Sequence, residues 1–497
     1  MRSYIVKPKS VRKSQILEKD YIFSSARYNS VQINSNFDYL VNLIDVSKKS
    51  ISLKNQRKYF NYVEIGSINT STGYVESTHK KSIDISVDSV FELKKDDILI
   101  STVRTYLGGI GLVNQDDSNF VSSKALIVLR KLKKDISRYY LLGVLRSSFF
   151  IEQTNLILNA SMYPRMDKDN FEHLKIPFPT TKNNPAPENV EKLVSLIVQN
   201  IIDKEEQIKA KNKLIDEKIE QELRENQKEN GFSYAYPKIS EIKEAGRLDT
   251  GLYERAFKNF NFLVKNYVEG GFKLEDKGYE ISRGQNLQIT NIGKSYYSEK
   301  KLNNKFYTLI LSSNISEDSV TIGKSYLGNI RKLKCIENED IIFCSRGAQF
   351  GRVAVFPEIE KNTITNIDNM HIKNKSANLS EKIFICQFLR YFRKIKHLYK
   401  IAIFGNGSFS FTKYHVLKLS FPDFPIHKQK EIAKLYYNIL DKNNDLTFED
   451  YLGKEKVRNK ELGIFQLNME IFRLKEILED LVHKIVMEEK IEINMSY

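Results

Sequence analysis

Two long stretches of the chain repeat apolar residues every seven positions, with Lys, Glu and Gln between them. In the first, the repeating residues are Val194, Ile201, Ile208 and Ile215. In the second, they are Val457, Ile464, Ile471, Leu478 and Ile485. A sustained seven-residue apolar repeat is typical of a coiled-coil helix, whereas an ordinary amphipathic core helix, the alternative, is usually shorter. We therefore predict two long helices, over 190–223 and 457–485, that pair in an antiparallel coiled coil.

The regions between the helices repeat each other at a fixed offset. An apolar run begins after Asp97 and another after Asp340, 243 positions later. Gly108 and Gly351 follow them at the same offset, and each precedes a second apolar run. Short apolar runs can resemble each other by chance, but chance similarity of apolar runs does not explain glycines at the same offset. The repeat predicts two similar domains, each with strands around the glycine turn and a helix, at 139–158 in the first and 381–399 in the second.

Composition limits what these domains bind. The chain has 497 residues, a net charge of +16 and a sequence pI near 9.3. Such an excess of positive charge points to an anionic partner, and nucleic acid is the first candidate. The 27 Tyr and 29 Phe exclude a disordered chain. No apolar run reaches the 18 residues of a membrane span, and three scattered cysteines form no disulfide framework, so we expect a cytoplasmic protein without membrane attachment.

The layout resembles the specificity (S) subunits of Type I restriction-modification systems. The similarity extends over almost the whole chain, through motifs that are loose singly but specific in order. They are the strand and turn at 97–108, the helix at 140–150, the loop at 160–169 with Tyr163-Pro164-Arg165, the strand end at 174–177 and the helix start at 425–432. Two departures are that Pro185-Ala186-Pro187 replaces a second copy of this helix start, and that the second half lacks Tyr-Pro-Arg.

The resemblance implies an α+β fold and a DNA-recognition function. It implies two tandem mixed α/β target recognition domains, at 1–187 and 232–427, joined by two long antiparallel coiled-coil helices, a central one at 188–231 and a C-terminal helical region at 428–497. Each domain would read half of a bipartite site in double-stranded DNA. The helices would dock methyltransferase (M) subunits and a restriction/translocase (R) subunit. The chain itself would be non-catalytic and hold no cofactor, because S-adenosylmethionine, ATP and Mg²⁺ are expected in the partner subunits.

Cationic, aromatic and amide side chains in the loops are the candidates for DNA contact. A loop Arg can pair with a phosphate or with a guanine edge, although a solvated surface Arg is an equally good reading. The same residue types recur around Tyr-Pro-Arg in the first half and around Asn-Gly-Ser in the second. The predicted DNA-binding residues are Arg104, Tyr106, Tyr163, Arg165, Lys168, Arg346, Gln349, Asn406, Ser408 and Lys413.

The helices carry the second group of candidates. The apolar repeats need a partner surface, and we expect partner subunits to dock along them. The residues that represent these docking helices are Ile201, Ile208, Ile215, Ile471 and Leu478.

The competing function is a stand-alone Mg²⁺-dependent DNA endonuclease. Asp84 followed by Glu92 and Lys94 has the spacing of metal-dependent nucleases, and carboxylates can hold Mg²⁺. A Glu-x-Lys pattern arises often in so charged a chain, and the second half has no equivalent. No phosphate-binding loop, His-Glu-x-x-His motif or amino-methyltransferase tetrapeptide is present. We expect no metal site and no catalytic residue in this chain.

Overall fold

A computed structural model describes residues 3–18, 28–54, 56–116, 118–157, 171, 173–228, 231–405, 407–441 and 446–493. The chain divides into two compact units. Unit 1 consists of Met1–Glu206, Asp441–Lys460 and Met469–Tyr497, and unit 2 of Gln207–Leu440 and Glu461–Asn468. Segments of the two units therefore alternate along the sequence. The division into 1–187, 188–231, 232–427 and 428–497 stays a prediction. In the described part of the chain, no helix is long and apolar enough to cross a membrane.

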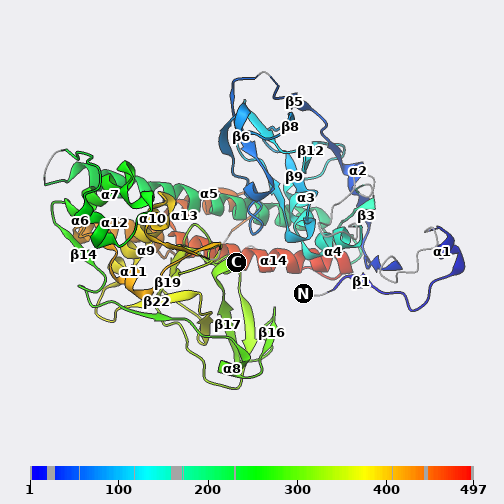
Figure 1. The fold of residues 1–497 in the computed structure, drawn as a ribbon. Coiled ribbons are helices and arrows are strands. Elements are labelled where there is room, and N and C mark those ends of the chain that lie inside the picture. Colours follow the sequence, from blue (N-terminus) through cyan, green and yellow to red (C-terminus); the bar gives the residue numbers. More distant parts are fainter. Residues whose placement is uncertain are drawn as a thin grey trace. The chain divides into compact units, whose positions relative to one another are not determined.

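Unit 1 is built on two larger β-sheets, drawn in blue and cyan in Figure 1. The first sheet is antiparallel, in the order β10 (Ile110–Leu112), β9 (Ile98–Ser101), β12 (Leu126–Leu132) and β4 (Ile44–Val46). The second has the order β5 (Ser50–Ser52), β8 (Ser89–Glu92), β11 (Phe120–Ser122), β6 (Tyr59–Val63) and β7 (Thr78–Lys81), with β11 and β6 parallel. Two-stranded pairs join β1 (Ile5–Val6) to β2 (Ser30–Val31) and β3 (Phe37–Tyr39) to β13 (Lys175–Pro177).

The core of unit 1 follows from the alternation of side chains along its strands. Phe120 and Val121 are neighbours on β11 and point to opposite faces of their sheet. Phe120 packs with Leu99 and Val128 of the first sheet, while Val121 joins a separate apolar cluster. Strand β9 is buried at all four positions, as its uninterrupted apolar sequence predicts.

Unit 2 repeats this arrangement. One sheet has the order β15 (Glu280–Arg283), β22 (Asn369–Lys373), β19 (Ile341–Cys344) and β20 (Val353–Val355). The other has the order β16 (Tyr296–Ser298), β18 (Ser325–Gly328), β17 (Phe306–Ile310) and β21 (Thr363–Thr365), with β17 and β21 parallel. Strand β14 (Gly271–Lys273) pairs with β25 (Ser420–Pro422), and β23 (Ile403–Gly405) with β24 (Ser408–Ser410).

The predicted internal repeat is confirmed by these pairings. Strands β9 and β19 start 243 positions apart, as do β12 and β22, and each pair lies in the same place in its sheet. Buried Asp97 pairs with Arg130 in unit 1, and Asp340 pairs with Lys373 at the same offset in unit 2. The units differ at the outer strands of the second sheet, where β5 and β8 have no counterpart in unit 2 and β16 has none in unit 1.

Each single helix predicted beside the sheets is in fact two helices. The stretch predicted at 139–158 forms α3 (Arg138–Leu145) and α4 (Ser148–Ile157). They separate because the Ser147 hydroxyl donates to the Val144 carbonyl and accepts from the Phe150 amide. The stretch predicted at 381–399 forms α9 (Leu379–Lys394) and α10 (His397–Ile401), separated by Lys396 with a left-handed backbone. The apolar repeat continues across both breaks, so the sequence pattern did not predict where one helix ends and the next begins.

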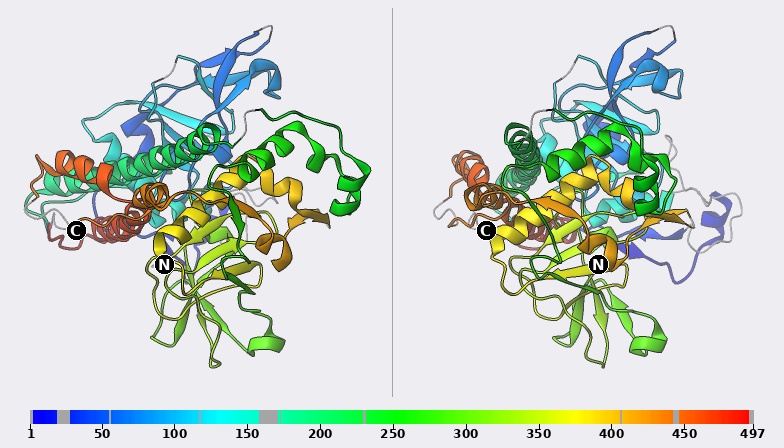
Figure 2. Two further views of the ribbon diagram at one scale, coloured as in Figure 1. Left: turned by 90° about the vertical axis from the view of Figure 1, so that its left-hand side faces the viewer. Right: turned by 60° about the vertical axis from the view of Figure 1, so that its left-hand side comes forward.

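The predicted central helix is confirmed as α5, Pro187–Glu225, the long helix in Figures 1 and 2. Its first part lies in unit 1, where it runs antiparallel to α14 (Ile464–Met487). The Ile491 amide, just beyond the end of α14, donates to Asn184 Oδ1 at 2.9 Å, before the start of α5. Lys204, farther along α5, pairs with Glu470 near the start of α14 at 2.6 Å. These two contacts fix the antiparallel direction predicted for the helices.

The C-terminal repeat was predicted to be one helix from Val457, and this is wrong. The chain forms α13 (Tyr451–Glu461) and then α14, with Gly463 between them. A Cβ atom on Gly463 would lie 2.4 Å from the Asn438 amide nitrogen, so the backbones approach where no side chain fits. Val457 is 67% exposed and does not belong to the apolar repeat that begins at Ile464.

Shorter helices complete the described structure. In unit 1 they are α1 (Lys13–Glu18) and α2 (Leu40–Leu43). In unit 2 they are α6 (Ile239–Ala245), α7 (Arg255–Lys265), α8 (Ile289–Ile292), α11 (Lys413–Leu417) and α12 (Ile426–Tyr436). Helix α12 begins after Pro425, at the helix start that the sequence indicated, because proline cannot donate a backbone hydrogen bond and is tolerated at a helix start.

Candidate nucleic-acid interface

In unit 1, a rigid turn after β9 presents Arg104 and Tyr106 to solvent. The Thr105 hydroxyl donates to the Ser101 carbonyl at 2.7 Å, and the Thr102 hydroxyl donates to the Ala125 carbonyl at 2.9 Å. Arg104 has a left-handed backbone, with φ of 50°, and an exposed side chain. The buried threonine therefore anchors the turn while the neighbouring cation and ring face outward. A fixed exposed Arg is suited to contact a phosphate or a base edge.

In unit 2, the matching turn after β19 lies against the β23–β24 hairpin. Arg346 forms an isolated bridge with Ser410, and the Phe411 amide donates to the Ser345 carbonyl at 2.8 Å. The Phe350 and Phe409 rings stack with centroids 6.0 Å apart. The structure therefore brings predicted residues from distant parts of the sequence together: Arg346 and Gln349 of the turn, and Ser408 of the hairpin.

Lys413 lies just beyond this hairpin, exposed in the first turn of α11. It belongs to a group of five cations, of which the sequence predicted only Lys413 and Arg346, because strand pairing brings the segments of the others together. The other members are Arg283 on β15, Lys334 before β19, Lys373 on β22, and Arg346. Burial, and then Arg346, lower the pKa of Arg283. Burial, and then Lys373 and Lys413, lower the pKa of Lys334.

The acidic neighbours of this group are few. Arg346 Nε lies 3.0 Å from Asp368 Oδ1, and Lys373 Nζ lies 2.9 Å from Asp340 Oδ2 and 3.6 Å from Glu337 Oε1. His371, which lies on β22 with Lys373, is buried. Burial, and then Lys334 and Lys373, lower the pKa of His371 to about 3. The five cations do not all share one surface: in the pairing of β15 with β22, Arg283 lies opposite Met370 and Lys373 opposite Glu280, so the Arg283 and Lys373 side chains are on opposite faces of the sheet.

Four of the predicted DNA-binding residues lie outside the described residues. They are Tyr163, Arg165, Lys168 and Asn406. The other six lie at surface turns or beside the hairpin of their own unit. Their contact with DNA remains a prediction.

The residues predicted on the docking helices are mostly covered by the chain itself. Ile201, Ile208, Ile215 and Ile471 are buried, and Leu478 is half-buried. The premise that these apolar repeats need an external partner is therefore wrong. Their direct role is to pack the helices within the chain.

The nuclease residues are occupied in ion pairs or set apart. Lys49 Nζ lies 2.9 Å from a Glu92 carboxylate oxygen, and Arg130 Nη1 lies 3.6 Å from the same oxygen. Asp84 is exposed at the end of a 3-10 turn, Ser82–Asp84. Over the described ranges, no group of three or more His, Cys, Asp or Glu residues is placed to hold a metal ion.

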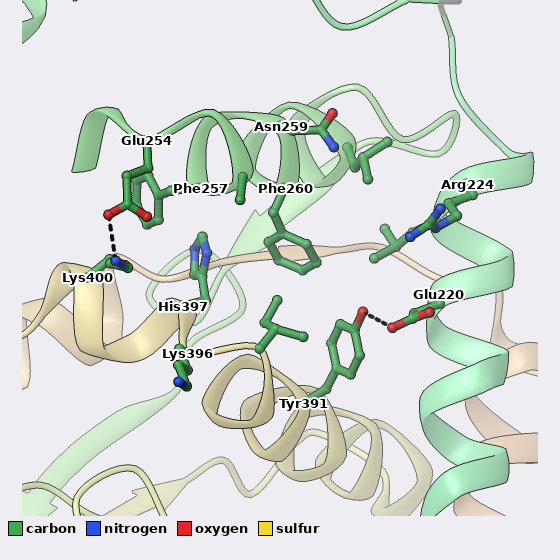
Figure 3. A pocket seen from close by; sticks show the side chains of 14 residues that line it. Glu220, Arg224, Glu254, Phe257, Asn259, Phe260, Tyr391, Lys396, His397 and Lys400 are labelled. Carbon is green, nitrogen blue, oxygen red and sulfur yellow. Dashed lines mark hydrogen bonds and ion pairs between the residues drawn. The ribbon is translucent and has the colours of Figure 1, made fainter. Parts of the chain in front are cut away.

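A cavity of about 440 Å³ in unit 2 lies between the end of α5, helix α7 and the α9–α10 corner (Figure 3). Its walls are largely apolar, with the rings of Phe257 and His397 stacked at 4.5 Å. Tyr391 donates to Glu220 at 2.8 Å, and Lys400 pairs with Glu254 at 2.8 Å. Burial lowers the pKa of His397 to about 3, so it stays neutral. The cavity contains none of the predicted DNA-binding residues.

Part of the chain is similar to a known protein family. Residues 39–215 match the family model described as "Type I restriction modification DNA specificity domain". That segment contains the first sheets, the Arg104 turn and most of α5. This part of the chain is similar to a Type I restriction-modification DNA specificity domain, and the match covers 177 of the 497 residues.

Solved structures of such proteins are also similar to the chain. One belongs to a study of complex assembly in a type I R-M system, at 14% identity and TM-score 0.30, covering 92% of this chain and 99% of that one. The HsdS subunit from Thermoanaerobacter tengcongensis has 15% identity and TM-score 0.29, covering 92% and 97%. The S subunit from M. genitalium has 14% identity and TM-score 0.42, covering 93% and 97%. No curated protein matches the sequence.

Proposed function

We propose that the chain reads a bipartite DNA target, with one unit on each half-site. The observation that carries this proposal is the repeated pair of sheets, with the same strand order in both units and different outer strands. A shared framework supports the same kind of contact twice, while different outer strands and loops favour two different half-site sequences. The Arg104 turn and the Arg346 turn occupy equivalent places after β9 and β19.

Paired substitutions test this proposal. Arg104→Ala should relax recognition in one half-site only, and Arg346→Ala in the other only, because each arginine belongs to a different unit. Losing one good base contact costs about 1–3 kcal/mol of discrimination. The readout is methylation sequencing of DNA from cells that express each variant with the methyltransferase subunits. Each variant is the control for the other, and relaxation of both halves by one substitution would contradict the assignment.

We propose that methyltransferase subunits dock on the outward faces of the helices and that a restriction/translocase subunit completes the complex. Support comes from the family match and from apolar side chains exposed on the helices in unit 1. Val457 on α13 and Met469 on α14 are both more than half exposed. Val457→Glu and Met469→Glu should reduce co-purification with the methyltransferase subunits without changing the circular dichroism spectrum. Lys456→Glu, next to Val457, is the matched control for the added charge. Undiminished co-purification of both apolar variants would contradict docking at these faces.

We propose that the chain itself is non-catalytic and acts in the cytoplasm. S-adenosylmethionine, ATP and Mg²⁺ would then be used by the partner subunits. The purified chain supplied with all three should neither methylate nor cleave DNA. Cleavage by the chain that is lost in Asp84→Ala would instead support the endonuclease.

A further inference from the structure

The solvent face of the β6–β7 ribbon in unit 1 carries an exposed aromatic and cationic surface. In the antiparallel register, Tyr59 lies opposite Lys81 and Asn61 opposite His79, so these four side chains share one face. The other face is turned to the core through Phe60 and Tyr62. Tyr59 is nevertheless 48% exposed, and His79 and Lys81 are exposed as well.

The geometry of this face is ordered. The Tyr59 and His79 rings are stacked, with centroids 4.8 Å apart and planes within 3° of parallel. His79 Nδ1 lies 3.0 Å from Asn61 Oδ1, which fixes the second ring against the strand. Lys81 Nζ lies 5.6 Å from the centre of the Tyr59 ring. The stacked rings hold one another and position the ammonium group beside them.

The charge around the ribbon is mostly positive and mostly unpaired. No carboxylate of the described residues pairs with Lys81, or with Arg57 and Lys58 at the start of β6. The acidic groups nearby in sequence are Glu64, which lies 3.9 Å from Lys80, and exposed Glu76 and Asp84. Three unpaired cations at one end of an exposed ribbon are complementary to a phosphate chain.

The outer edge of the corresponding sheet in unit 2 has the same character. Its edge strand β16 carries Tyr296 and Tyr297, which are 61% and 55% exposed. Lys294 and Lys300 lie on either side of that strand. Exposed tyrosines beside lysines in both sheets are not explained by edge protection alone, for which lysines suffice.

We propose that the β6–β7 ribbon is a sequence-independent contact to the DNA backbone, with Lys81, Arg57 and Lys58 pairing with phosphates. Tyr59 and His79 position Lys81 and pack against the sugar–phosphate chain. This inference deepens the proposed function, on which it rests, by adding a surface that binds DNA of any sequence beside the turns that select it.

Salt dependence of DNA binding tests the proposal. Each phosphate contact contributes about 0.9 to the slope of log affinity against log salt, so losing one reduces the slope by about one unit. The Lys81→Ala defect should therefore be about 3.5-fold larger at 50 mM than at 200 mM salt. The probes are two duplexes, one with the target found by methylation sequencing and one with the same bases scrambled, and the protein is the chain assembled with its methyltransferase subunits. Both duplexes should lose affinity by the same factor.

Matched variants distinguish a phosphate contact at the ribbon from a general effect of lost charge. Lys182→Ala removes the same charge from unit 1 at a site that is 71% exposed and paired with Glu488, and it should keep the wild-type slope. Tyr59→Ala should weaken binding to both duplexes, whereas Tyr59→Phe, which keeps the stacked ring, should not. An unchanged slope in Lys81→Ala, or a loss confined to the target duplex, would overturn the ribbon contact. Equal binding of both duplexes by the wild-type complex would instead overturn the proposed function.

Discussion

Lys204 should be the most sensitive position in the paired helices of unit 1. Its side chain is fully buried in α5, and its Nζ lies 2.6 Å from Glu470 Oε2, 3.3 Å from Glu455 Oε2 and 2.6 Å from Asn459 Oδ1. One ammonium thus links α5 to both α13 and α14. Removing it leaves Glu470 with Arg458 at 2.9 Å, and Glu455 with Arg458 at 3.8 Å and the Asn200 amide at 3.1 Å.

Breaking a buried ion pair by removing one partner costs about 3–5 kcal/mol. For a unit of this size, that corresponds to a fall in Tm on the order of 10 °C. We predict this fall for Lys204→Ala, measured by scanning calorimetry, with faster amide hydrogen exchange in α13 and α14. The control is Lys213→Ala on the same helix, where a 77% exposed side chain pairs with Glu217 and the expected change is below about 0.5 kcal/mol.

The same network predicts a dependence on pH. Burial raises the pKa of Glu470, but Arg458 and then Lys204 outweigh it, and the pKa lies below the ordinary value of 4.5. Ionised Glu470 therefore stabilises unit 1 above pH 4.5, and this stabilisation is lost as the pH falls through its lowered pKa. In Lys204→Ala the loss should begin at a higher pH. A Lys204→Ala protein as stable as Lys213→Ala, with the wild-type acid profile, would refute the reasoning.

Three further predictions concern single side chains. Asp97→Asn should lower the free energy of unfolding in urea by about 3–5 kcal/mol, because the buried carboxylate accepts two hydrogen bonds from Arg130. Asp340→Asn should lower it by less, because burial raises the pKa of Asp340. Equal losses would contradict this prediction. Burial and then Arg146 lower the pKa of Lys475 from 10.5 to about 8. The stability of the wild type should therefore rise between pH 8 and 10.5 relative to that of Lys475→Met. Parallel profiles of stability against pH for the two proteins would contradict this prediction. Gly463→Ala should destabilise unit 2 by more than about 2 kcal/mol, because the added Cβ would lie 2.6 Å from the Tyr436 carbonyl oxygen. Urea unfolding measures this loss. A variant as stable as the wild type would show that the backbone can shift at little cost.

The repeat and the long helix could be predicted because their signals are local and periodic. Ile201, Ile208 and Ile215 recur at a fixed interval, and matched glycines mark the same turn in both halves. The breaks at Ser147, Lys396 and Gly463 could not be predicted, because each depends on a hydrogen bond, a left-handed residue or a close backbone approach within a stretch that remains apolar.

The candidate interface could be predicted only in part. Arg104 and Arg346 stand next to recognisable strands and glycines, so their turns were visible in the sequence. Arg283 and Lys373 were missed because the pairing of β15 with β22 brings them into one sheet from positions 90 residues apart. The Tyr59–His79 stack was missed for the same reason, since register decides which residues face each other across β6 and β7.

Methylation sequencing of the wild-type complex tests the central claim most directly. DNA from cells that express this chain with its methyltransferase subunits should carry modified bases in one motif made of two different specific halves and a non-specific gap of fixed length. A single uninterrupted motif, or methylation that does not depend on this chain, would contradict the account.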